Sequence, residues 1–165
     1  MSLPPIPKIL RAAIDYNGAD PRRVHHLIKV YGFAQTIGAG EQLDARTQYI
    51  LEAAAVLHDI GIHEAERKHG SSAGKFQEQE GPAIARALLA PLSMPEDITE
   101  RICFLIAHHH TYHAVDGIDY QILLEADFLV NAYEDELPRS AIEYFCKKTA
   151  KTATGLDLIR ALFLP

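Results

Sequence analysis

The chain is 165 residues long, the length of one domain built around a single apolar core. Hydrophobic residues make up 48% of it and charged residues 23%, a balance typical of a globular rather than a disordered protein. The formal net charge of -6 provides no broad cationic surface for a nucleic acid backbone. We therefore predict a single domain over residues 1–165, without a polynucleotide partner.

The cysteines and the apolar segments bear on the cellular compartment. Cys103 and Cys146 are too few for a disulfide framework, and both lie in helical patterns beside apolar residues, so they are predicted to be reduced core thiols. We find neither a secretion signal nor an apolar run of about 18 residues. We expect a cytoplasmic protein with no membrane partner, and the sequence leaves homo-oligomer formation open.

Helical periodicity runs through every segment between turn signals, so the predicted fold class is all-α. Asp20 followed by Pro21 indicates a helix start, and Asp44 is a second N-cap. Residues 60–70 and 110–117 are expected to be irregular, with Gly61 as the C-terminal stop of the third helix. The predicted helices span residues 6–16, 21–37, 44–58, 72–89, 95–109, 118–136 and 138–148, and the last dozen residues.

The histidines are concentrated in one part of the chain. All nine lie within residues 25–113. In the second predicted helix His26 shares a face with Val30, Phe33 and Ile37, so its imidazole is predicted to point into the core. A single inward histidine is most often a hydrogen-bonded core residue. A metal site becomes the better interpretation when other side chains that can bind a metal also point into the core.

An imidazole and a carboxylate stand side by side at the end of the third predicted helix. His58 and Asp59 directly follow the apolar run 53–57, where burying an unpaired carboxylate is costly. A cation would remove that cost, and this pair of ligand types suits borderline divalent metals. The alternative is that Asp59 caps backbone amides of the next turn while His58 donates to a carbonyl.

A second carboxylate is predicted to be buried in the helix over 118–136. Asp127 shares its stripe with Leu123, Leu124 and Val130 rather than with a polar face. It therefore requires a buried partner. A salt bridge would serve, but a metal that needs an anionic ligand explains the position with fewer assumptions.

The order of these motifs resembles that of the HD superfamily of metal-dependent phosphohydrolases. The resemblance rests on His26, the doublet His58-Asp59 and the late Asp127, and it covers about residues 26–131. It implies a single-domain HD-type helical bundle in which these four residues are the metal ligands. The implied cofactor is a divalent ion, with Mn, Fe, Co, Ni, Mg and Zn as candidates.

Some HD enzymes bind two metals and use further histidines between the doublet and the final aspartate. His109 and His108 are the additional candidates here, because they end the helix over 95–109. The alternative is a rim of imidazoles that faces substrate without binding metal. Gln77 stands where many two-metal relatives have a histidine. The sequence therefore predicts one firmly bound metal per chain, with the triplet 108–110 recruiting a weaker second ion when a substrate phosphate bridges the gap.

Phosphate ester hydrolysis also requires cations beside the metal. Arg22 lies one turn before the first histidine ligand on the same helix face, and Arg23 and Lys68 are further candidates for binding the substrate. Their alternative interpretation is solvated surface charge. Arg22 and Asp59 are the predicted catalytic residues, and Glu80 is another candidate for proton transfer.

The resemblance implies a phosphomonoesterase or phosphodiesterase whose partner is a small phosphorylated substrate, with a nucleotide as one candidate. Two alternatives come from other classes of protein. One is a non-catalytic, metal-stabilised domain that binds a nucleotide or regulates a partner. The other is a di-iron oxygenase of the HD type. Fold-level analogy does not separate the three.

Overall fold

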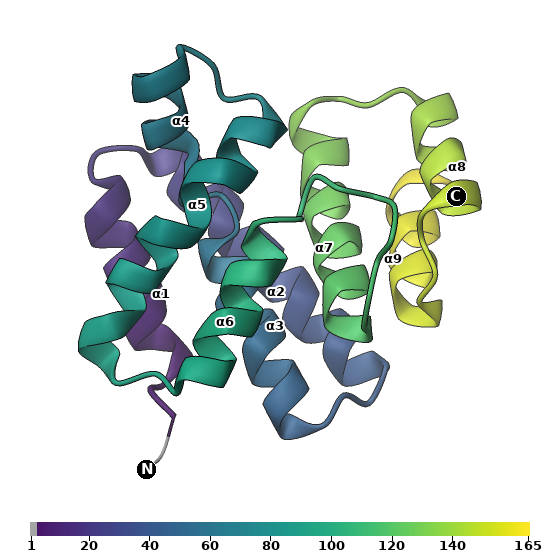
Figure 1. The fold of residues 1–165 in the computed structure, drawn as a ribbon. Coiled ribbons are helices and arrows are strands. Elements are labelled where there is room, and N and C mark those ends of the chain that lie inside the picture. The colour runs from purple at the N-terminus through teal and green to yellow at the C-terminus, as the bar shows by residue number, and fades with distance from the viewer. Residues whose placement is uncertain (1–2) are drawn as a thin grey trace.

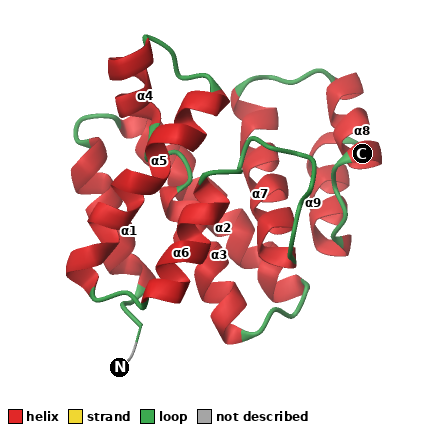
Figure 2. Ribbon diagram, viewed as in Figure 1, coloured by secondary structure: helices red, strands yellow, loops and turns green. Residues whose placement is uncertain are grey.

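The computed structural model describes residues 3–165, and within this range the chain is a bundle of helices without a strand (Figure 1, Figure 2). The predicted all-α class is confirmed. Among the same residues, no helix combines the length and hydropathy that a membrane crossing needs. The elements are α1 (Ile6–Asn17), α2 (Pro21–Gly40), α3 (Ala45–Leu57), α4 (Ile62–His69), α5 (Gly74–Leu89), the 3-10 turn η1 (Ala90–Leu92), α6 (Glu96–Ile106), α7 (Ile118–Glu134), α8 (Arg139–Lys148) and α9 (Ala153–Phe163).

Two predicted N-caps start the helices that carry the site. The side chain of Asp20 accepts a hydrogen bond from the backbone N–H of Arg23, and Pro21 occupies the first turn of α2. Asp44 accepts from the backbone N–H of Thr47 at the start of α3. These caps satisfy amides that have no partner within the helix and so fix where each helix begins.

The stretch 60–70 is helical rather than irregular, because α4 occupies most of it. Only Ile62 and Ala65 of this short helix are buried, so the sequence carries too few apolar positions to show a period. The helix is supported instead by an ion pair between Glu64 and Arg67. It ends at Gly70, whose φ of 63° is left-handed.

Gly61 has a different role from the predicted helix stop. Its φ of -81° is ordinary right-handed backbone, so it is not a left-handed cap. A Cβ atom added there would lie 2.6 Å from the backbone nitrogen of Gly81. The absence of a side chain at Gly61 lets the turn after the His58-Asp59 doublet lie directly against α5, whereas a Cβ atom at Gly81 would meet the side chain of Ile106.

Three helices form the centre of the bundle. Helix α2 packs along both α3 and α7, and residues 119–130 of α7 are buried without interruption. Figure 1 shows α1, α4, α5 and α6 on one side of this centre, with α8 and α9 on the other. Polar side chains on the facing surfaces of α2, α3 and α7 are therefore enclosed by the core.

Candidate metal centre

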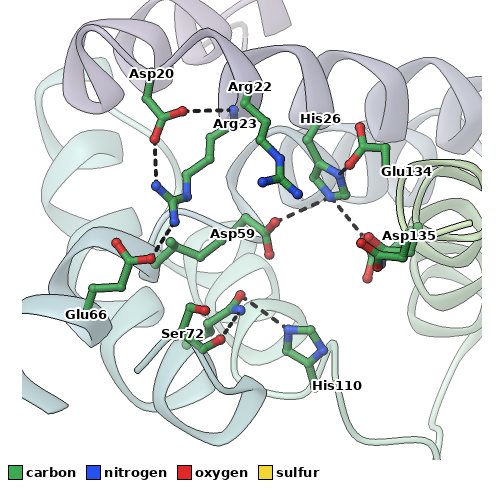
Figure 3. A pocket seen from close by; sticks show the side chains of 14 residues that line it. Asp20, Arg22, Arg23, His26, Asp59, Glu66, Ser72, His110, Glu134 and Asp135 are labelled. Atoms are coloured by element: carbon green, nitrogen blue, oxygen red, sulfur yellow. Dashed lines mark hydrogen bonds and ion pairs between the residues drawn. The ribbon is translucent and has the colours of Figure 1, made fainter. Parts of the chain in front are cut away.

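The four ligand residues predicted from the sequence meet where α2, the end of α3 and α7 converge. The Nε2 atom of His26 lies 3.2 Å from Nε2 of His58 and 3.2 Å from Oδ1 of Asp127. Oδ2 of Asp59 lies 3.3 Å from the same His26 nitrogen, and Figure 3 shows these two side chains facing each other. The structure thus places two imidazoles and two carboxylates around one point.

Hydrogen bonds to the protein fix which nitrogen of each imidazole faces that point. Nδ1 of His58 donates to the carbonyl of Ala55 over 2.7 Å. Nδ1 of His26 is 2.8 Å from the carboxylate of Glu134. When both imidazoles are neutral, each ring presents the lone pair of Nε2 to the other, and two lone pairs at 3.2 Å repel unless a positive charge, a proton or a metal ion, lies between them. This arrangement fits a metal ion.

The charges of the cluster also favour a cation. Burial opposes protonation of His58, but Asp59 and Asp127 outweigh it and raise the pKa of His58 to about 9. Burial would likewise raise the pKa of Asp59, yet His58 and His109 hold it below its ordinary value. The two carboxylates thus remain ionised in the interior, where a positive charge is needed to offset them.

A second group of side chains that could hold a metal ion shares Asp59 with the first. Its other members are His109 and His110. His109 is fully buried, its Nδ1 donates to the carbonyl of Ile106 over 2.7 Å, and its Nε2 has no hydrogen-bond partner among residues 3–165. That nitrogen lies 3.3 Å from Oδ1 of Asp59. Asp59 therefore lies between two clusters of imidazoles, as a bridging carboxylate would.

His108 is not brought into either cluster. Its Nδ1 donates to the carbonyl of Phe104 over 2.7 Å, and its ring stacks on that of Phe104 with centroids 4.2 Å apart. Helix α6 ends at Ile106 rather than at 109, so the turn that follows directs His109 and His110 toward Asp59. The sequence placed His110 only in the triplet that recruits a weaker ion and not among the individual ligand candidates, because the orientation of His110 depends on this helix end.

Gln77 is part of the same site. Its Oε1 accepts a hydrogen bond from Nε2 of His110 over 3.2 Å, and its Nε2 donates to the carbonyl of Ser72 over 2.7 Å. Burial, and then His109, lower the pKa of His110 to about 4, so the His110 imidazole is neutral at neutral pH. Gln77 thus stands beside the second cluster, where an additional metal ligand would be placed.

A cavity of about 540 Å³ opens above the clusters. Figure 3 shows Arg22 extending from α2 into the space beside His26 and Asp59. Among residues 3–165 the guanidinium of Arg22 has no hydrogen bond or ion pair, in contrast to that of Arg23, which pairs with Asp20. Arg22 is therefore available to a ligand. The lining residues are Asp20, Arg22, Arg23, His26, Asp59, Ile62, Glu66, Ser72, Gln77, His110, Asp127, Asn131, Glu134 and Asp135.

Arg23 lines the cavity but is already neutralised. Its guanidinium donates to Asp20 and to Glu66, each over 2.6 Å. His63 also lies 2.9 Å from Asp20, and hydrogen bonds from His63 and Arg23 lower the pKa of Asp20 to about 2. This network ties α4 to the start of α2 at the mouth of the cavity.

Lys68 and Glu80, both nominated from the sequence, lie outside this cavity. They pair with each other over 2.7 Å, and His69 is 3.0 Å from the same carboxylate. Their hydrogen bonds join α4 to α5 along a separate hollow lined also by Tyr16. The structure therefore gives Lys68 no contact with a ligand at the metal cluster. The short helix α4, which the sequence did not predict, determines its direction.

No family model and no curated protein matches this chain. Among solved structures, the chain is similar to a crystal structure from an uncultured Thermotogales bacterium, described as a predicted HD superfamily hydrolase. The TM-score is 0.62 at 24% sequence identity, over 94% of this chain and 81% of the other. The protein thus has the fold of an HD-domain structure, as the motif order predicted.

Proposed function

We propose that the chain is a metal-dependent phosphohydrolase that cleaves a small phosphate ester. The observation that carries the proposal is a buried cluster of imidazoles and carboxylates at the floor of a cavity whose wall holds the unpaired Arg22. Two imidazoles and two carboxylates suit a borderline divalent ion. The similarity to an HD-superfamily hydrolase adds support by fold.

In this proposal His26, His58, Asp59 and Asp127 would hold a divalent ion, which when bound would supply a water molecule of lowered pKa and a positive charge for the phosphate. Arg22 binds the phosphoryl oxygens and stabilises the charge that develops on them. Asp59 is the acid–base residue, because its side chain is 19% exposed toward the cavity whereas that of Asp127 is 4% exposed. Asp127 therefore serves the metal alone.

The proposal is tested by stripping the protein of metal and screening phosphomonoesters and phosphodiesters with Mn²⁺, Co²⁺, Mg²⁺, Ni²⁺ and Fe²⁺ added singly. We expect hydrolysis that depends on the added ion. The variants His58→Ala and Asp59→Asn should lose metal and hydrolysis together while circular dichroism still reports a helical protein. His113→Ala is the matched control, because His113 is exposed and outside both clusters.

Two results would count against the proposal. Retention of stoichiometric metal by both His58→Ala and Asp59→Asn would show that these residues are not ligands. Unfolding of the wild-type chain on metal removal, with no hydrolysis of any ester after reloading, would instead indicate a metal-stabilised binding domain.

A further inference from the structure

Most of the residues that line the cavity above the candidate metal cluster are charged or polar. Ile62 is the only aliphatic residue among its lining residues within 3–165, and no Phe, Tyr or Trp lines it. Pockets for small organic ligands are usually lined by hydrophobic and aromatic side chains, and nucleobases gain much of their binding energy by stacking on aromatic rings. The imidazoles of His26 and His110 line the cavity, but they are engaged by Glu134 and Gln77.

The cavity offers one cation in addition to the metal cluster. Arg23 is held between Asp20 and Glu66, and no partner within residues 3–165 engages Arg22. Asp135, a further carboxylate, also lines the wall. One phosphate group therefore finds a counter-charge at Arg22, whereas the additional phosphates of a polyphosphate would meet carboxylates, and like charges repel.

One wall of the cavity is formed by the C-terminal end of α7 and the residue that follows it. Asn131 and Asp135 lie one helical turn apart and both line the cavity. Neither side chain forms a hydrogen bond within the described residues 3–165, in contrast to Glu134 between them, which binds Lys29 and His26. A free amide and a free carboxylate side by side are suited to hydroxyl groups, which donate to the carboxylate and exchange hydrogen bonds with the amide.

We propose, on the basis of the phosphohydrolase function above, that the substrate is the monophosphate of a small, hydroxyl-rich, non-aromatic alcohol: a sugar or polyol phosphate. The phosphate lies at Arg22 and the metal cluster, and the hydroxyls lie at Asn131 and Asp135. A water oxygen bonds to phosphorus while the ester P–O bond breaks. The proton released by the water passes to the alkoxide oxygen, which gives the free alcohol and inorganic phosphate.

A matched pair of substrates tests whether the cavity lacks a binding site for a nucleobase. Ribose phosphate and adenosine monophosphate carry the same phosphate on the same sugar and differ by the adenine. With the Mn²⁺-loaded full chain, we expect kcat/KM for ribose phosphate to exceed that for adenosine monophosphate by about tenfold or more. Adenosine triphosphate should be a still poorer substrate. Equal or higher kcat/KM for either adenine nucleotide would overturn the proposal.

Titration calorimetry separates this proposal from the phosphohydrolase function itself. Binding of ribose phosphate to the Mn²⁺-loaded chain without turnover, with weaker binding of adenosine monophosphate, would support the ligand class and defeat the hydrolase function. Efficient hydrolysis of the nucleotides would support the function and overturn the ligand class. No binding of ribose phosphate would overturn the ligand class as well.

Substitutions on α7 test the hydroxyl contacts. Asn131→Ala and Asp135→Ala should each raise KM for ribose phosphate by about tenfold, the loss expected for a hydrogen bond to a charged or amide group. KM for p-nitrophenyl phosphate, whose leaving group carries no additional hydroxyl, should rise far less. Glu136→Gln is the control, because Glu136 is exposed beside Asp135 and does not line the cavity. Equal changes in KM for both substrates would overturn the assigned contacts.

Discussion

The carboxylate of Glu134 lies 2.8 Å from Nδ1 of His26, across the contact between α7 and α2. Its other oxygen forms an ion pair with Lys29. Since the hydrogen of the imidazole is directed to Glu134, the Nε2 atom that faces Asp59 and Asp127 keeps its lone pair. Glu134 would therefore position His26 for metal binding, in the way that carboxylates orient zinc-bound histidines.

Removing this carboxylate should weaken metal binding without unfolding the protein. We expect Glu134→Gln, which keeps a weaker acceptor, to lower the affinity for Mn²⁺ by about tenfold, and Glu134→Ala to lower it by up to about 100-fold. Titration calorimetry on metal-free protein measures the affinity, and the visible spectrum of the Co²⁺ form reports the ligand geometry. Glu136→Gln is the control for charge. An unchanged affinity in Glu134→Ala would show that the contact is structural only.

Arg22 should act on substrate and not on metal. We expect Arg22→Ala to raise KM for phosphate esters by about 10–100-fold, because it removes a charge-assisted contact, and to leave the affinity for Mn²⁺ unchanged. Arg22→Lys should restore part of the loss. Arg46→Ala is the control, since Arg46 pairs with Asp97 outside the cavity. If Arg22→Ala and the wild type had the same KM, Arg22 would be a solvated surface charge that does not contact substrate.

The contact between Gly61 and Gly81 predicts an effect on stability. Gly61→Ala would place a methyl group 2.6 Å from the backbone nitrogen of Gly81, which no side-chain movement relieves. We expect a loss of about 1–3 kcal/mol in the free energy of unfolding, measured by urea denaturation. Gly32→Ala in α2 meets nothing within 4 Å and should be neutral or slightly stabilising. Equal stability of the two variants would contradict the role assigned to Gly61.

The parts of the site that the sequence predicted lie on long, regular helices or directly follow one. His26 and Asp127 could be placed because the phase of a helix and its apolar neighbours determine which side chains face the core. His58 and Asp59 were recognisable because an apolar run leads directly into them. In each case a few residues next to the ligand candidate in the sequence are enough to predict that its side chain is buried.

The parts that the sequence did not predict depend on helix ends or on distant partners. His110 faces Asp59 because α6 ends at Ile106, a boundary that periodicity does not locate to within three residues. Glu134 meets His26 across 108 positions of sequence, and no local pattern indicates such a pair. The α4 helix buries only two residues, and it is α4 that directs Lys68 toward Glu80.

The number of bound metals is the last property that the structure lets us predict. The first cluster would offer four ligands, because Asp127 lies 3.2 Å from His26 beside the group of His26, His58 and Asp59. The second cluster would offer Asp59, His109 and His110, with Gln77 beside them. A neutral amide oxygen binds borderline metals less well than an imidazole. We expect one tightly bound ion in the free protein and a second ion that binds at least about tenfold more weakly.

Replacing the amide by an imidazole should complete the second site. We expect Gln77→His to bring the stoichiometry of tightly bound Mn²⁺ from one toward two, measured by metal analysis and calorimetry. Gln79→His is the matched control, because Gln79 lies on the same helix with its side chain exposed. Inorganic phosphate should likewise raise the affinity of the wild type for the second ion, since a phosphate oxygen that bridges the clusters would supply the missing ligand.

Two tightly held ions in the free wild-type protein would contradict this prediction, and a His109→Ala variant would then locate the error. If His109→Ala lost only the second ion, Gln77 would be a sufficient ligand despite its neutral charge. If both ions were lost, the two clusters would behave as one site joined through Asp59, the carboxylate that lies 3.3 Å from the imidazole nitrogens of both His26 and His109. In that case removing a ligand from either side would leave Asp59 without the geometry that holds the other ion.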